Sequence, residues 1–158
     1  MSKFVGDLDV RLLHDDKDET WELLAPFAFY SDELKSLIQA YQGFQTDFMS
    51  APRVPVVYLT LGNRGRRLGV IHDLAYQTQM FPRKVCDNLI LEMGPLCGFS
   101  WTEIWQVYVA VRMCGQSHYG DQKEDEPVYN CTITRAIDME GDSGIDYLPG
   151  GIVSCLRG

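Results

Sequence analysis

The stretch that most constrains the fold is LGVIHDLAYQTQMFPRKVCDNLILEM, residues 68–93. Its apolar side chains recur at helical spacing on both sides of Pro82, and proline is favoured at the first position of a helix. The sequence therefore predicts two helices joined by a short turn. Four polar residues lie within the apolar faces: His72, Asp73, Tyr76 and Asp87. Because an unsatisfied polar group is costly there, these side chains must satisfy one another or form a site.

The flanking segments predict an α+β fold. Residues 3–13, 20–30 and 36–48 have the alternation and aromatic content of strands; Pro26 interrupts the second, and Gly43 marks a bulge or a close backbone approach in the third. A helix begun by Pro55 is predicted over residues 55–61. We expect a small antiparallel N-terminal sheet packed on a middle of three to four helices, with an irregular C-terminal extension.

A further helix is predicted over residues 101–115. Ser100 followed by Glu103 has the spacing of a capping box, which starts a helix. The residues expected to face inward or along the rim of this helix are Ile104, Tyr108, Val111 and Arg112. Trp101 and Trp105 are predicted to be core or packing aromatics.

The chain is predicted to divide near residue 120. Residues 1–120 are expected to form the α+β domain, because the strand and helix patterns lie there. Residues 121–158 have weak periodicity and an acidic, Gly-bearing composition, with one strand predicted over residues 128–137.

Charge and cysteine content exclude several classes of protein. The net charge of −8 argues against nonspecific binding to nucleic acid or anionic membranes. No apolar run approaches the roughly 18 residues of a membrane span, so a soluble chain without a transmembrane segment is expected. The five cysteines are an odd number without a C-x-x-C pair, which fits neither a disulfide framework nor a zinc cluster and favours a reducing compartment.

The candidates for chemistry are Asp47, His72, Asp73 and Asp87. A neutral imidazole beside carboxylates can act as a general base on water, and carboxylates can hold a hard divalent cation such as calcium. On a helix, His72 and Asp73 project about 100° apart and can do different jobs. If the protein is an enzyme, we therefore expect His72 and Asp87 to be catalytic and Asp47 and Asp73 to bind the metal.

The same residues also fit a purely structural network. Three carboxylates in one cluster repel one another unless they are protonated, bound to a cation or paired with arginine. Arg53, Arg83 and Arg112 are available as partners. A buried network of this kind would lock the sheet to the helices without catalysing any reaction.

An ordered set of residues resembles a family known mainly from bacteriophages and prophages, catalogued as domain of unknown function 1353. The shared residues include Trp21, Gly43 to Phe48, Ser50, Pro52, Arg53, His72, Asp73, Tyr76, Arg83, Asp87, Leu91 to Met93, Tyr108, Arg112 and Gly115. The resemblance extends over roughly residues 21–120 and implies a phage origin and a small soluble fold, with no established activity.

A second, local resemblance is to secreted and parvoviral phospholipase A2. In those enzymes a helix carries His-Asp with a Tyr three residues later, and an Asp on an antiparallel helix orients the His. The resemblance implies that His72 is the base, Asp73 the calcium ligand and Asp87 the orienting carboxylate, with Tyr76 in support. Residues 58–63 stand where a calcium loop would be, but they lack its glycine pattern.

Three functions remain open from the sequence. The first, favoured by the phage resemblance, is a virion-associated head or tail protein or an assembly component that contacts other phage proteins. The second is a metal-dependent hydrolase that acts on the host cell envelope through His72. The third is an inhibitor of a host defence protein. The expected location is the virion or the host cytoplasm.

Overall fold

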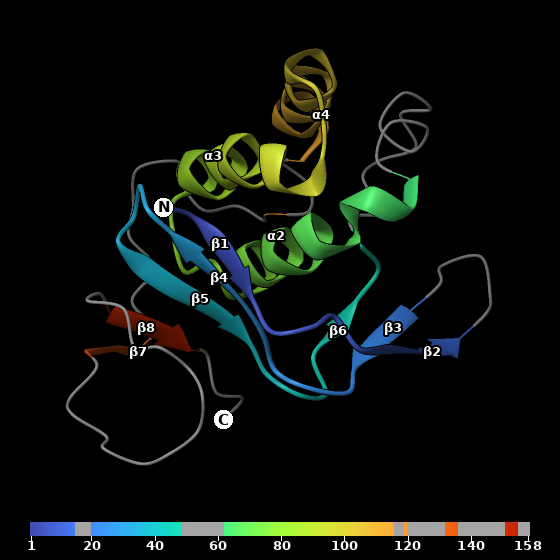
Figure 1. Ribbon diagram of the computed structural model, residues 1–158, viewed down its shortest axis with the longest axis vertical. Coiled ribbons are helices and arrows are strands. Elements are labelled where there is room, and N and C mark those ends of the chain that lie inside the picture. The colour runs from blue at the N-terminus through green and yellow to red at the C-terminus, as the bar shows by residue number, and fades with distance from the viewer. Residues whose placement is uncertain (15–19, 49–61, 116–118, 120–131, 136–150, 155–158) are drawn as a thin grey trace.

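The computed structural model describes residues 1–14, 20–48, 62–115, 119, 132–135 and 151–154. The helices are stacked above the strands in Figure 1. Helix α2 (Arg66–Thr78) contacts the strands, α3 (Arg83–Met93) packs on α2, and α4 (Trp101–Cys114) packs on α3. Helix α4 is therefore the outermost described helix. Short 3₁₀ turns at Gly62–Gly65 and Pro95–Cys97 precede α2 and α4.

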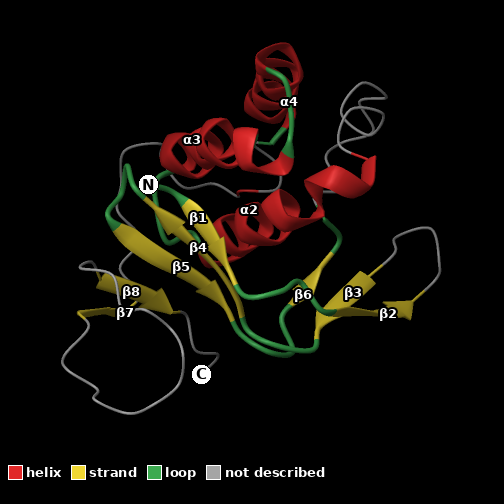
Figure 2. Cartoon of the chain, in the orientation of Figure 1, coloured by secondary structure: helices red, strands yellow, loops and turns green. Residues whose placement is uncertain are grey.

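The strands form two sheets, shown in Figure 2. Their bounds are β1 Lys3–Val5, β2 Val10–His14, β3 Thr20–Leu23, β4 Phe27–Ser31, β5 Ser36–Ala40, β6 Gln45–Thr46, β7 Thr132–Arg135 and β8 Gly151–Ser154. One sheet has the order β1-β4-β5-β8-β7 and the other the order β2-β3-β6. The described pairs are antiparallel, except that β5 and β8 are parallel.

The N-terminal segments divide between the two sheets where the sequence interrupts them. Residues 3–13 give β1 to one sheet and most of β2 to the other, and the segment around Pro26 separates β3 from β4. Gly43 forms the expected bulge. Leu23 exchanges backbone hydrogen bonds with both Gly43 and Phe44, and Gly43 has a φ of 84°, a conformation that glycine adopts without strain.

The core lies between the larger sheet and the helices. Its sheet side includes Phe27, Phe29 and Ile38, and its helix side includes Leu68, Ile71, Leu74, Leu89, Ile90 and Met93. The hydrophobic spacing therefore predicted the two helices, α2 and α3, whose apolar side chains form part of the core. The α+β fold class is confirmed.

Two glycines allow the layers to approach closely. A Cβ added at Gly69 of α2 would lie 2.9 Å from the carbonyl carbon of Phe48, and one added at Gly94 would lie 2.5 Å from the Ile104 side chain. Both distances are too short for a real Cβ contact. Because glycine has no Cβ, Gly69 lets α2 pack against the chain after β6, and Gly94 lets α4 pack against the end of α3.

The predicted capping box is present at the start of α4. The Ser100 hydroxyl accepts from the Glu103 backbone N–H, and Glu103 accepts from the Ser100 backbone N–H at 2.7 Å. Arg64 donates to Glu103 at 2.9 Å. The bonds from Ser100, followed by that from Arg64, lower the pKa of Glu103 to about 2. The sequence signature therefore placed the helix start correctly.

The C-terminal strands join the larger sheet. Strand β7 lies within the predicted strand over residues 128–137, whereas β8 was not predicted and pairs with β5. The helix expected over residues 55–61 lies outside the described residues. The division near residue 120 stays a prediction. In the described parts of the chain, no helix has the length and apolar character needed to cross a membrane.

Candidate functional site

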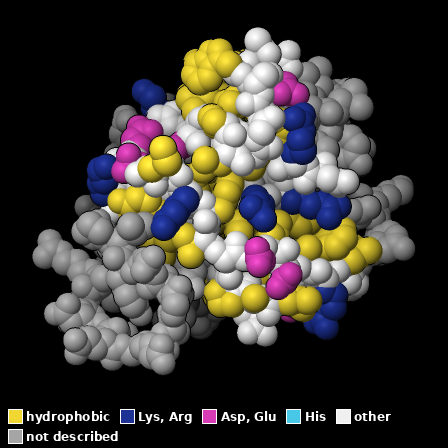
Figure 3. All heavy atoms as spheres, viewed as in Figure 1, with side chains coloured by type: hydrophobic (Ala, Val, Ile, Leu, Met, Phe, Trp, Pro, Cys, Tyr) yellow, Lys and Arg dark blue, Asp and Glu magenta, His cyan; other side chains and the backbone are white. Residues whose placement is uncertain are grey.

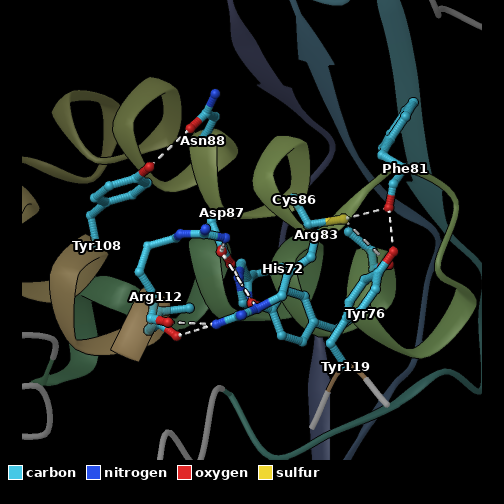
Figure 4. Close-up of polar contacts among 12 residues, drawn as sticks. His72, Tyr76, Phe81, Arg83, Cys86, Asp87, Asn88, Tyr108, Arg112 and Tyr119 are labelled. Carbon is cyan, nitrogen blue, oxygen red and sulfur yellow. Dashed lines mark hydrogen bonds and ion pairs between the residues drawn. The ribbon is translucent and has the colours of Figure 1, made fainter. Parts of the chain in front are cut away.

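The α2–α3 hairpin brings most of the predicted site residues together. Four residues, 79–82, connect the helices, and Gln79 ends α2 in a left-handed conformation with a φ of 51°. Tyr76 then lies opposite Asp87, as Figure 4 shows. His72 precedes Tyr76 by one helical turn, and their ring centroids are 4.2 Å apart. The short connection therefore places a histidine, a tyrosine and a carboxylate at one point.

Asp87 is the centre of this cluster, and its exposed fraction is 0%. The Tyr76 hydroxyl donates to Oδ1, and Arg112 Nη1 of α4 donates to Oδ2 at 2.9 Å. Arg83 Nε lies 3.8 Å from Oδ2. Burial alone would raise the pKa of Asp87, but the contacts with His72, Tyr76 and Arg112 outweigh it and lower the pKa. The carboxylate is thus a buried anion stabilised by neighbouring hydrogen-bonding side chains, among them the cationic Arg112.

Arg83 connects the cluster to the end of α4. Its Nη2 donates to the backbone oxygens of Val111 at 3.2 Å and Arg112 at 2.6 Å. These carbonyls belong to the last turn of α4, where carbonyl groups run out of partners within the helix; the Val111 oxygen also accepts from the Gly115 backbone N–H at 2.7 Å. A cationic side chain is favourable at this end of a helix. Together, Arg83, Asp87 and Arg112 fix the C-terminal turn of α4 to α3.

His72 lies at the edge of this arrangement and is 3% exposed. Its Nε2 is 3.5 Å from Asp87 Oδ1. Among the described residues, this nitrogen is buried without a hydrogen-bond partner. The imidazole is therefore beside the carboxylate that was predicted to orient it, but does not form a well-aligned hydrogen bond with it.

Asp73 points to a different neighbour from His72. It is nearly buried and accepts from the Thr46 hydroxyl of β6 at 2.5 Å. Thr46 in turn accepts from the Phe48 backbone N–H at 3.0 Å. The roughly 100° between consecutive residues on a helix explains the separation. Asp73 thus ties α2 to the smaller sheet, while Asp87 ties α2, α3 and α4 together.

Asp47 follows Thr46 directly in the chain and is exposed. The structure therefore does not bring Asp47, Asp73 and Asp87 into one buried cluster. In the described residues, no group of three or more His, Cys, Asp and Glu side chains is arranged to hold a metal ion. Arg53 lies outside the described residues. The catalytic and metal-binding roles of these residues stay predictions.

Aromatic residues and a thiol surround the cluster. Tyr119 packs edge-on against Tyr76, with ring centroids 5.2 Å apart, and donates from its hydroxyl to the backbone oxygen of Phe81 at 2.8 Å. The Cys86 thiol donates to the same oxygen at 3.3 Å. Burial and the nearby Asp87 raise the pKa of Cys86 to about 12, which keeps its thiol protonated at neutral pH. Burial followed by the bond to Asp87 raises the pKa of Tyr76.

The outer face of α4 is apolar and exposed, in contrast to the polar and buried cluster around Asp87. We call it the α4 ridge: Trp101, Trp105, Val109 and Met113, which recur every four residues and are all exposed. Trp101 is 62% and Met113 78% exposed. Figure 3 shows hydrophobic side chains at the top of the molecule, where α4 lies. Of the two roles predicted for Trp101 and Trp105, core or packing aromatics, the structure shows packing against neighbouring rings, outside the core.

The buried cluster explains why polar residues interrupt the apolar helical faces. It holds three helices together through an ion pair, a tyrosine hydrogen bond and a helix-end cap. A histidine next to a carboxylate can also serve as a general base, provided that its other nitrogen reaches water. In the structure His72 is 3% exposed, and the described contacts of the cluster join helices to one another.

A family model described as "Protein of unknown function (DUF1353)" matches residues 21–111, more than half of the chain. The chain belongs to this family. No curated protein and no solved structure matches the chain.

The DUF1353 match spans the elements that build the buried cluster. It includes β6, α2 and α3, and therefore Thr46, His72, Tyr76 and Asp87. It ends at Val111, whose backbone oxygen accepts from Arg83. Arg83 and Arg112 had been considered from the sequence only as possible partners of the carboxylates. Tyr119 was missed, because it is separated from the helix pattern and carries no motif of its own.

Proposed function

We propose that this DUF1353 protein is a non-catalytic component of a bacteriophage particle, or of its assembly, that acts through protein–protein contacts made by the α4 ridge. The phage part rests on the resemblance of the residues between Trp21 and Gly115 to phage and prophage sequences. The contact part rests on the structure. The single observation that carries it is the exposure of the ridge along the whole of α4.

The ridge has the properties of an interface. Exposed contiguous apolar side chains rimmed by polar ones are typical of binding surfaces, and tryptophan and methionine are enriched at them. The ring centroids of Trp101 and Trp105 are 5.7 Å apart, and those of Trp105 and Tyr108 are 5.4 Å apart. The tryptophans are therefore held by neighbouring rings, which lowers the entropic cost of binding.

The buried cluster supports the same interpretation. Arg83 and Asp87 fix the last turn of α4, and the capping box fixes its first turn. A helix held at both ends presents its outer face in a fixed orientation. The cluster then serves recognition indirectly, by supporting the surface that binds.

Incorporation into particles tests this proposal. We expect the double variant Trp101→Ser and Met113→Ser, expressed in place of the wild type during phage production, to be lost from purified particles. Gln42→Ser is the matched control, because Gln42 is exposed in a turn outside α4. Immunoblots of purified particles measure the copy number. A folded double variant that enters particles at the wild-type level contradicts the proposal.

A specific observation favours one alternative, a metal-dependent hydrolase that acts on the host envelope. His72 Nε2 lies 3.5 Å from Asp87 Oδ1, and Tyr76 donates to the same carboxylate. The likeness to phospholipase A2 predicts that Asp87 orients His72, with Tyr76 in support. In this alternative His72 is the base, Asp87 orients it, and Asp73 with Asp47 holds calcium. The site would have to open, because His72 is almost fully buried.

Hydrolysis of phospholipid vesicles with and without calcium tests the alternative. We expect His72→Gln to abolish calcium-dependent release of fatty acid while the protein stays folded. Gln77→Ala on the exposed side of α2 is the control. No release by the wild type, or equal release by His72→Gln, rules the hydrolase out.

A further inference from the structure

We infer that the partner of the α4 ridge is a second copy of this chain, packed with its own α4 antiparallel across a two-fold axis. The inference rests on the proposed function and names the partner of that site. It starts from an imbalance within α4. The helix buries Ile104, Val107 and Val111 on its inner side, yet its outer side is also apolar. A helix that is apolar on two sides is typically packed on both.

The spacing of the ridge favours a helix as the occupant. Ridge residues separated by four positions form the continuous row that packs between the rows of a second helix. At about 1.5 Å per residue, the row from Trp101 to Met113 is roughly 18 Å long. A complementary helix of similar length covers it completely, and α4 itself has that length.

The sizes of the side chains favour a second copy in antiparallel orientation. The ridge is bulky at its N-terminal end, with Trp101 and Trp105, and slimmer at its C-terminal end, with Val109 and Met113. An antiparallel pair places Trp105 against Val109 of the other copy, and Trp101 against Met113. Large residues then meet small ones, and each Met113 thioether meets an indole, which is a favourable contact.

The charges permit this self-association. The ridge has no charged residue, and both charged residues of α4 are paired within the chain: Glu103 with Arg64 and Arg112 with Asp87, each at 2.9 Å. Like charges therefore do not oppose one another across the two-fold axis. The net charge of −8 on each copy acts at longer range, where salt screens it. We expect association to strengthen as salt increases.

Sedimentation velocity of the full chain tests the inference. A single helix pair buries less than the roughly 1,600 Å² of a standard interface, so we expect dimerisation at about 10–100 μM. The sedimenting mass should rise from the 18.0 kDa monomer to twice that value, more readily at 0.5 M than at 0.05 M sodium chloride. A monomer throughout this range overturns the inference.

Two variants test the register. Val109→Asp and Trp105→Arg should each weaken self-association by at least tenfold, while Gln42→Asp, with the same added charge as Val109→Asp, should not. Mixing the two ridge variants should restore dimers, because residue 109 of one copy faces residue 105 of the other. If each variant dimerises as well as the wild type, or if the mixture stays monomeric, the antiparallel arrangement is wrong.

The two proposals fail in different experiments. A monomeric protein whose ridge variant is lost from particles removes the homodimer and leaves the particle role, with a different partner for the ridge. A dimeric protein whose ridge variant still enters particles removes the particle role and leaves the homodimer. Circular dichroism of every variant at the same concentration confirms that the comparison is made between folded proteins.

Discussion

The α2–α3 hairpin and helix α4 distribute their side chains in opposite ways. The hairpin buries a charged and a titratable residue, Asp87 and His72, among apolar neighbours, whereas α4 leaves two tryptophans and a methionine in solvent. Each departs from the usual partition of polar and apolar residues. The difference indicates that the buried polar groups serve folding, whereas the exposed apolar groups serve association.

The physical reasons differ as well. A buried carboxylate is tolerated because it forms hydrogen bonds and ion pairs that no apolar residue can replace in that place, so it specifies one packing of three helices. An exposed tryptophan contributes little to that packing. Its presence along a whole helix face is explained by a contact outside the monomer. The hairpin therefore concerns folding, and the ridge concerns association.

The largest loss of stability is expected from a substitution that breaks the buried cluster. Asp87→Ala leaves Arg83 and Arg112 without the anion that lies 3.8 Å and 2.9 Å from them. We expect the free energy of unfolding to fall by about 3–5 kcal/mol. Removing the carboxylate of a buried ion pair leaves the positive charge of its partner in the protein interior without a counter-charge. Urea denaturation measures the loss. Asp7→Ala, an exposed carboxylate, should change it by less than about 0.5 kcal/mol.

A smaller loss of stability is expected when the pH is lowered. The pKa of Asp87 is lowered in the folded state, from an ordinary value of 3.8. Its ionised form therefore stabilises the fold fully above that value, and the contribution is lost as the pH falls through the folded pKa. The stability difference between wild type and Asp87→Asn should be constant from pH 7 to about pH 5 and shrink below about pH 4.

The same comparison provides its own control. Other carboxylates titrate in both proteins and cancel from the difference, so only the state of Asp87 is measured. Urea midpoints at each pH give the values. A difference that stays constant down to pH 2.5 would mean that the pKa of Asp87 is the same in the folded and unfolded states, and the description of its carboxylate as an anion stabilised by the cluster would be wrong.

The sequence predicted the local features of the hairpin well. Helical spacing located α2 and α3, and the positions of Tyr76 and Asp87 followed from a short connection between them. The capping box at Ser100 likewise depends only on neighbouring residues. These features are set by interactions within a few turns of the chain, which the order of residues describes directly.

Contacts between distant elements could not be predicted in the same way. Asp73 accepts from the Thr46 hydroxyl, a contact that exists only once β6 has been placed against α2. Arg83 reaches the last carbonyls of α4 through the way in which α3 and α4 pack. Strand β8 has weak periodicity, and its pairing with β5 is a long-range contact.

The orientation of α4 shows most clearly what could not be predicted from the sequence. Apolar residues surround this helix, so periodicity alone allows more than one inner face. The pattern places Ile104 and Val111 correctly, but it misses Val107 and leaves open whether the tryptophans lie in the core or pack outside it. The reason is physical: when both sides of a helix are apolar, the sequence does not say which one packs within the chain and which one outside it.

The smallest effect on folding is expected from the ridge. The double variant Trp101→Ser and Met113→Ser removes side chains that are 62% and 78% exposed, so little apolar area returns to water on unfolding. At a concentration where the chain is monomeric, we expect its free energy of unfolding to change by less than about 1 kcal/mol, since each surface substitution is typically within about 0.5 kcal/mol.

The comparison between the two regions is sharpest between one buried side chain of α3 and one exposed side chain of α4. Leu89→Ala in α3, which is 2% exposed, should cost about 2–5 kcal/mol by leaving a cavity, although it removes fewer atoms than Trp101→Ser. Urea denaturation of both variants at low micromolar concentration makes the test. If the ridge variant loses as much stability as Leu89→Ala, the ridge belongs to the folded core, and the case for an external partner ends there.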